Sequence, residues 1–173
     1  MKKALLLLLL LILALGLFSC GEDVNYTLNE KTFFLVMTNM QYYPEQYIGK
    51  TITYDCFTYR LTDVSGNEYM CGVRKCSSGY GCNCGRDTII GFILDYDGVI
   101  PEPKNQSEDT ADKTWVHLVG TLPEAKKQEI EIYAYQGDEI DYNTVERVVF
   151  YRFRVSSLTL IEDYSGLAYY VTK

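Results

Sequence analysis

Four of the chain's six cysteines fall within the segment CGVRKCSSGYGCNCGRD, which runs from Cys71 to Asp87. Thiolates bind soft ions such as zinc in tetrahedral sites, with sulfur about 2.3 Å from the metal. Four glycines in the same segment give the backbone the freedom to turn between ligands. We therefore predict a cysteine loop over residues 71–87 whose metal ligands are Cys71, Cys76, Cys82 and Cys84, with Asp87 able to replace one thiolate.

Disulfide bonds are the alternative chemistry for the same four side chains. Disulfides persist in exported proteins, and four cysteines can form two bonds in three pairings. A bridge between Cys82 and Cys84 would be strained because one residue separates them. Bonds such as Cys71–Cys82 with Cys76–Cys84 would stiffen the loop and leave Cys56 over as a buried apolar residue.

Other chemistries find little support in the sequence. Redox catalysis by a thiol typically uses a Cys-x-x-Cys motif before a helix, and the sequence has none. The single histidine, His117, is a distant candidate metal ligand. Without a second histidine, a metal-hydrolase site is not expected. The acidic residues Glu108, Asp109 and Asp112 do not have the spacing of a calcium-binding loop and indicate a solvated acidic loop. The protein is therefore predicted not to be an enzyme.

The compartment is indicated by the first residues, MKKALLLLLLLILALGLFSCGED. A short basic region precedes an apolar run that is typical of an export signal and too short to span a bilayer comfortably. The residues Leu17–Cys20 resemble the lipobox of bacterial lipoproteins. That resemblance implies that residues 1–19 are a signal peptide and that a diacylated Cys20 anchors the mature protein to the bilayer on the extracytoplasmic side.

The charge of the mature chain excludes one class of partner. Residues 1–19 hold two of the 16 lysines and arginines and no acid, so 14 basic side chains remain against 23 acidic ones, a formal charge of −9. Nucleic-acid binding depends on clustered Lys and Arg, so no nucleic-acid partner is expected. Sixteen tyrosines suit half-buried strands and, alternatively, a surface that stacks on a protein or glycan.

The pattern of the mature chain favours strands after one helix. Residues 20–28 are predicted to be a lipidated tether, and Thr27 with Glu30 forms a capping-box signature ahead of a helix within 31–43 that ends before Pro44. Strands are predicted where apolar residues alternate or run continuously. These strands are 51–61, 68–74, 88–97, 114–122, 128–137, 148–163 and 166–171, whereas 98–114 and 138–147 are predicted as loops, the second with a helical turn as the alternative.

This order of elements predicts the fold class. It is mainly β, with a small OB-like Greek-key barrel over residues 29–173, one N-terminal helix and the cysteine loop midway. A β-sandwich is the alternative.

Four stretches resemble a known family: YPEQYIGKTITYDCFTYR, CNCGRDTIIGFILDY, TWVHLVGTL and LIEDYSGLAYYV. Together they are similar to the C-terminal exported domain of the YcgQ-like permease accessory subunits over about residues 40–170. The matching positions are Cys82, Cys84, Asp87, Gly91, Trp115 and Gly120. Asn83 splits the family's cysteine pair, Cys71 and Cys76 are additional, and a lipid anchor replaces the family's membrane helices. The resemblance implies an OB-like fold, metal handling and a multi-pass permease partner.

The sequence thus predicts a lipid-anchored, extracytoplasmic accessory subunit that captures zinc through its cysteine loop and serves a membrane permease. The alternative is a structural or interaction module in which disulfides hold the loop and a tyrosine-rich face binds a protein or glycan.

Overall fold

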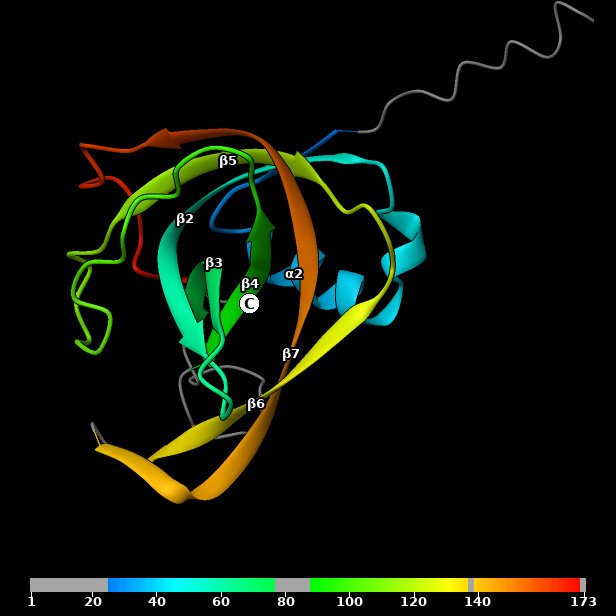
Figure 1. Ribbon diagram of the computed structural model, residues 1–173. Helices are drawn as coiled ribbons and strands as arrows, with labels where there is room; N and C mark the ends of the chain where they lie inside the picture. The colour runs from blue at the N-terminus through cyan, green and yellow to red at the C-terminus, as the bar shows by residue number, and fades with distance from the viewer. Residues whose placement is uncertain (1–24, 77–87, 137–138, 172–173) are drawn as a thin grey trace, which may run out of the picture.

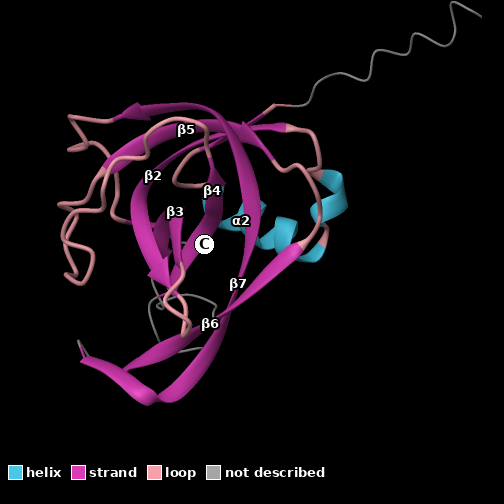
Figure 2. Cartoon of the chain, in the orientation of Figure 1, coloured by secondary structure: helices cyan, strands magenta, loops and turns pink. Residues whose placement is uncertain are grey.

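The structure, a computed structural model, describes residues 25–76, 88–136 and 139–171. Most of these residues belong to strands, and the helical part consists of α2 (Phe33–Tyr42) followed by the short 3-10 helix η1 (Pro44–Gln46) (Figure 2). The predicted mainly β class with one N-terminal helix is confirmed. No helix in the described ranges combines the length and the hydropathy needed to cross a membrane.

Five strands close into a ring, and Figure 1 shows β2 at its left, β5 at its top and β7 at its right. β2 pairs antiparallel with both β3 and β5, β3 pairs antiparallel with β4, β4 pairs parallel with β7, and β7 pairs antiparallel with β5. This closed order, with one parallel contact, is the Greek-key order of an OB-type barrel. The ring strands are β2 (Thr51–Thr62), β3 (Glu68–Cys76), β4 (Thr88–Asp95), β5 (Trp115–Thr121) and β7 (Glu139–Leu160).

The interior of the ring is filled from all five strands and from α2. On β2 the predicted alternation is confirmed, because residues 52, 54, 56 and 58 are buried. Three aromatic rings meet at the centre: Tyr54 lies 5.8 Å from both Phe92 and Phe153, and the latter two stack at 4.9 Å. Such packed rings contribute beyond their buried area.

A second hydrophobic cluster lies on the opposite face of β3 and β4. Cys71, Val73 and Ile93 contribute to it from these two strands, and Trp115 and Phe150 pack against them from β5 and β7. Because both faces of β4 are covered, its sequence is apolar at nearly every position. The prediction of a central strand there is confirmed.

Glycine permits the close contact between β3 and β4. A Cβ atom on Gly91 would lie 2.0 Å from the carbonyl oxygen of Gly72, which is backbone and cannot swing away. A Cβ atom on Gly72 would lie 2.7 Å from Leu118 Cδ1 and 3.0 Å from Cys56 Sγ. Position 91 therefore requires glycine for packing rather than for a turn, whereas a Cβ atom at position 72 would force neighbouring side chains to shift.

The N-terminal predictions need two corrections. Residues 26–28, predicted as tether, form the strand β1 (Tyr26–Leu28), which pairs in parallel with Ile52 to Tyr54 and buries Leu28. The predicted capping box is also wrong. The Asn29 side chain accepts hydrogen bonds from the backbone N–H groups of Lys31 and Thr32 instead, so Asn29 organises the start of α2.

The predicted loop or helical turn at 138–147 is wrong for residues 139–147, which are the first part of β7. This half of β7 pairs with β6 (Lys127–Gln136), and the two strands form an arm that projects from the ring at the bottom of Figure 1. Because most side chains on this half of β7 are solvent-exposed, polar residues occupy it despite its strand conformation. A composition rule mistakes such a strand for a loop.

The C-terminal segment returns to the ring. β8 (Tyr170–Val171) pairs in parallel with Lys75 and Cys76 at the end of β3, which confirms the predicted short last strand.

Candidate functional site

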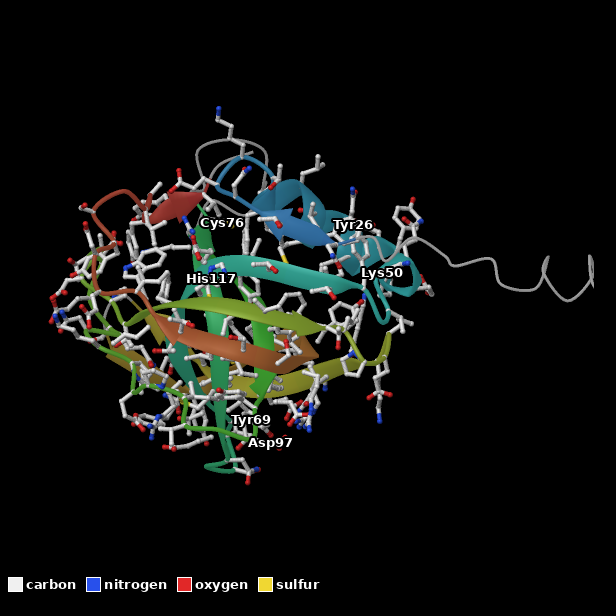
Figure 3. All side chains as sticks on the ribbon, turned by 90° about the horizontal axis from the view of Figure 1, so that it is seen from above. Tyr26, Lys50, Tyr69, Cys76, Asp97 and His117 are labelled. Carbon is white, nitrogen blue, oxygen red and sulfur yellow. The ribbon has the colours of Figure 1, made fainter. Side chains whose placement is uncertain are left out.

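The predicted metal ligands divide between the described and the undescribed parts of the chain. Cys71 and Cys76 belong to β3, so residues 71–76 of the predicted cysteine loop are strand. Cys82, Cys84 and Asp87 lie outside the described residues, as does the predicted lipidation site Cys20. Figure 3 shows Cys76 at one end of β3, near β8, and Tyr69 at the other end.

The geometry of β3 separates Cys71 from Cys76. A strand rises about 3.3 Å per residue, so the two Cα atoms are roughly 16 Å apart. Five positions also place the two side chains on opposite faces, Cys71 in the second cluster and Cys76 in the interior. One ion, which needs its thiolates within about 4 Å of each other, cannot bind both while β3 stays paired.

The Cys71 side chain has the properties of a structural thiol. It is a free, buried cysteine, and burial raises its pKa to about 12. Cys56 is likewise free and fully buried, as predicted, and burial raises its pKa although the positive charge of Arg74 opposes that shift. A thiol with so high a pKa is inert at neutral pH. In the ranges that the structure covers, no three His, Cys, Asp or Glu side chains converge as a metal site.

Two basic side chains, Arg74 and Lys75, hold the carboxyl end of β3, next to Cys76. Arg74 is only 3% exposed and donates hydrogen bonds to the carbonyl oxygens of Asp55 (3.1 Å) and Ala168 (2.5 Å). Its guanidinium also lies 5.0 Å from the centre of the Trp115 ring and 3.8 Å from a carboxylate oxygen of Glu30. Arg74 thus joins β3 to four segments that are distant in sequence.

Lys75 makes the second connection, to the acidic loop. Its ammonium group lies 2.7 Å from Asp109 and faces the rings of Tyr169 and Tyr170 at 5.5 and 5.2 Å. The Tyr170 hydroxyl donates to the same Asp109 carboxylate at 2.7 Å. Nearby, Asp112 accepts from Lys104 and Tyr164. These acids therefore brace the loop, and the prediction of a purely solvated loop is too simple.

His117, the distant candidate ligand, is paired with a carboxylate. Its Nδ1 lies 2.6 Å from Asp55 Oδ1 on the neighbouring strand β2, and both side chains are partly exposed. This pair occupies the outside of the ring, where Figure 3 labels His117.

A groove of about 390 Å³ lies at the other end of β3, between the β2–β3 turn and the arm. β2 and the turn provide one wall, β6 and β7 provide the opposite wall, and Gln106 comes from the acidic loop. The lining residues are Tyr59, Arg60, Leu61, Thr62, Asp63, Val64, Gly66, Gln106, Ile132, Tyr133, Ile140 and Tyr142. In OB-type barrels, this region between the first strand turn and the later loops is a frequent binding face.

A bulge in β7 shapes one wall of the groove. The pairing register of β6 with β7 shifts between Tyr133 and Ala134, whose partners are Val145 and Asp141. Residues 142–144 are therefore additional on β7. Bulges commonly re-aim a side chain at a functional surface.

Tyr142, within the bulge, is held in a defined position although it is 69% exposed. The Asp141 carboxylate accepts hydrogen bonds from Asn143 N (2.9 Å) and Thr144 Oγ1 (2.6 Å), which closes the bulge. The rings of Tyr142 and Tyr133 meet edge to face at 5.1 Å. The groove thus carries an ordered pair of tyrosines.

Sequence reasoning missed this groove, because its walls come from segments that are far apart in the chain. One local signal was present: Asp-x-Asn-Thr at residues 141–144 is turn chemistry inside a stretch with apolar residues at 140, 142 and 145. Turn residues within a strand pattern indicate a bulge.

The five-stranded ring with its groove defines an OB-type β-barrel domain. The chain belongs to the family of the DUF1980 C-terminal domain, whose profile matches residues 19–148. This membership supports the relation to the YcgQ-like family domain that the sequence motifs indicated. Neither the curated proteins nor the solved structures contain a match to the chain.

Proposed function

We propose that this protein is a lipid-anchored, extracytoplasmic accessory subunit of a membrane permease and that it has no catalytic activity of its own. Membership of the DUF1980 C-terminal family carries the proposal, because it ties the chain to a domain of permease-related proteins. The export signal and the lipobox sequence at Leu17–Cys20 support the anchor, and the net negative charge of the mature chain argues against a nucleic-acid partner.

The anchor is tested by fractionation of a bacterial host that expresses the full chain. We expect the protein in the membrane pellet, resistant to high salt, released by detergent and labelled by radioactive palmitate. Cys20→Ala should abolish the label and release the protein from the pellet. Cys56→Ala is the matched control, since that cysteine is buried in the barrel, and it should leave the label unchanged. An unlabelled full chain would contradict the anchor.

The finer part of the proposal is a soft-metal site, with zinc as the ion. Since Cys71 and Cys76 cannot share an ion, the proposed ligands are Cys82, Cys84 and Asp87, with Cys76 at the base of the segment as the fourth. Zinc would cross-link the segment, and the subunit would present the ion to the permease. Arg74 and Lys75 add positive charge at this base, which offsets the charge of thiolates.

Elemental analysis of the protein purified anaerobically without chelator tests the site. We expect near-stoichiometric zinc that the double substitution Cys82→Ser, Cys84→Ser removes. Cys71→Ala should retain the ion, because its side chain lies on the other face of β3. Zinc retained by the double variant, or lost only with Cys71, would contradict the proposed ligand set.

The second candidate is a disulfide-held interaction module, which the predicted exported location and the tyrosine-lined groove favour. A count of free thiols in denaturant separates the two. Metal binding leaves all five thiols of the mature barrel reactive once the ion is removed. A protein without metal and with three or fewer free thiols would hold disulfides instead.

A further inference from the structure

We propose that the groove between β2 and β6 binds an extended peptide segment of a partner protein, which adds to the sheet as a further strand. The inference rests on the backbone edges, the aromatic lining and the charge of this groove. It does not depend on the metal proposal, because the groove and Cys76 lie at opposite ends of β3.

The first edge belongs to β2. Its outward-facing backbone groups are occupied in turn: Thr58 N donates to the Thr114 carbonyl at 2.9 Å, and Arg60 is bound by the Gln106 side chain. The Gln106 amide accepts from Arg60 N and donates to Arg60 O, both at 2.8 Å. These are the two hydrogen bonds that a neighbouring strand would make. By strand alternation, the backbone groups of Thr62 face the same edge, within the groove.

The second edge belongs to β6, which pairs with β7 alone among the described strands. One contact closes the far end of the groove: Val64 N donates to the Glu131 carbonyl at 2.9 Å. The outward edge of β6 therefore includes residue 131, and alternation places the backbone of Tyr133 on it as well. On β2, only Thr62 lies between Arg60, which Gln106 binds, and Val64, which bonds to Glu131. The open edge that can recruit an extended chain is therefore mainly that of β6, with Thr62 opposite it.

The side chains along this gap suit a peptide with apolar residues at alternate positions. Tyr142 and Ile140 are 69% and 42% exposed, and the half-buried Ile132 continues the apolar surface towards the barrel. An added strand points every second side chain to one face, so its apolar residues would cover this surface. Tyrosine is also among the residue types that are enriched at the energetic hot spots of interfaces.

The polar groups of the groove favour a peptide over a saccharide. Asp63 already accepts hydrogen bonds from the backbone N–H groups of Ser65 and Asn67 and from the Tyr69 hydroxyl. Gln106 is likewise engaged by Arg60. A saccharide requires free polar side chains for its hydroxyl groups, whereas a strand bonds to the backbone edges.

The charge around the groove selects a basic partner segment. Arg60 is shared between Glu68 and Glu102, and Arg147 pairs with Glu131. Together with Asp63 and Glu129, carboxylates outnumber guanidinium groups around this surface. Lysines or arginines that flank the apolar core of the peptide would therefore accelerate its association.

A peptide library tests the proposal on the mature chain. Each peptide has six central positions, in which randomly chosen apolar residues alternate with threonine. Two lysines precede these six positions and two lysines follow them. We expect the best binders to protect the amides of Thr62 and Tyr133 from hydrogen exchange at least tenfold. In the same peptides, N-methylation of every second backbone amide, on the side that would pair with the protein, removes hydrogen bonds and leaves the side chains unchanged. This change should weaken binding at least tenfold.

Two variants locate the site. Tyr142→Ala should weaken binding about tenfold without a change in fold, since the side chain is largely exposed. Tyr43→Ala, an exposed tyrosine that follows α2, should have no effect. The proposal is overturned if no library member binds more tightly than its N-methylated counterpart, or if Tyr142→Ala changes nothing. Protection of the same amides by chitooligosaccharides but not by peptides would assign the groove to a glycan instead.

Discussion

The two ends of β3 differ in how their side chains are used. At the carboxyl end, Arg74 and Lys75 are enclosed by β8, the acidic loop and the N-terminal segment, and their polar atoms bind groups of the chain itself. At the amino end, beside Tyr69, the groove leaves Tyr142 and Ile140 in solvent and two strand edges without a neighbouring strand. The first end is built for rigidity, and the second end keeps apolar surface available.

The comparison shows where stability and binding separate in this molecule. At the carboxyl end, both terminal nitrogens of the buried Arg74 guanidinium are hydrogen-bonded, and this polar network can fix the end of β3 in one arrangement. Exposed aromatic surface at the amino end contributes little to folding. Substitutions at the carboxyl end should therefore lower the free energy of unfolding, whereas substitutions at the amino end should weaken binding and leave stability nearly unchanged.

The largest effect on stability is expected from Arg74→Ala. The substitution leaves the carbonyls of Asp55 and Ala168 without their donor and opens a cavity beside Trp115. We expect the free energy of unfolding in urea to fall by about 3 kcal/mol. Arg147→Ala on the exposed arm is the control and should cost less than about 0.5 kcal/mol. Equal losses from both would remove the distinction between the two ends.

A smaller effect is expected from the buried Cys71 thiol at high pH. The pKa of the Cys71 thiol is about 12 in the folded protein and near 9.0 when unperturbed. The folded state therefore holds this proton more tightly than the unfolded state does. The resulting contribution to the free energy of unfolding is complete below pH 9 and is lost as the pH rises towards 12. Each pH unit in this window changes the free energy of unfolding by up to about 1.4 kcal/mol per group. Cys71→Ala should therefore flatten the decline in stability between pH 9 and 10.5, as measured by urea unfolding. An unchanged slope would show that Cys71 is exposed to solvent.

The bridge from Lys75 to the acidic loop should contribute about 1 kcal/mol, because the carboxylate of Asp109 is partly solvated. Its hydrogen bonds, first of all from Lys75, lower the pKa of Asp109 below 3.8. The contribution is thus present above that pH and is lost as the pH falls through the lowered pKa. Asp109→Asn should reduce the free energy of unfolding at pH 7 and have no effect at pH 2. A loss that persists at pH 2 would point to packing instead of charge.

The smallest effect on stability is expected from Tyr142→Ala. Since the ring is mostly exposed, the midpoint of thermal unfolding should shift by less than about 2 °C, within the range of ordinary surface substitutions. The same variant should lose peptide binding about tenfold. A large shift of the midpoint would place Tyr142 in the folding core and weaken the comparison between the two ends of β3.

Local patterns determined much of the fold. The alternation of Ile52, Tyr54 and Cys56 predicted β2, and the doubly apolar run at Ile89 to Leu94 predicted a central strand, because side-chain period and burial are local properties of a strand. The strand count and the single helix then favoured an OB-type ring, and its closed pairing order confirms that choice.

Only the tertiary structure decided what the cysteines and the groove are. Spacing within CGVRKC is compatible with a loop, and only the pairing of β3 with β2, β4 and β8 shows that Cys71 and Cys76 are fixed on opposite faces. The groove requires β2, the acidic loop and the arm to meet, and contacts such as Gln106 with Arg60 span 46 residues. A sequence records which residues prefer a strand or a turn, whereas the packing of distant segments fixes which of their side chains and strand edges remain accessible.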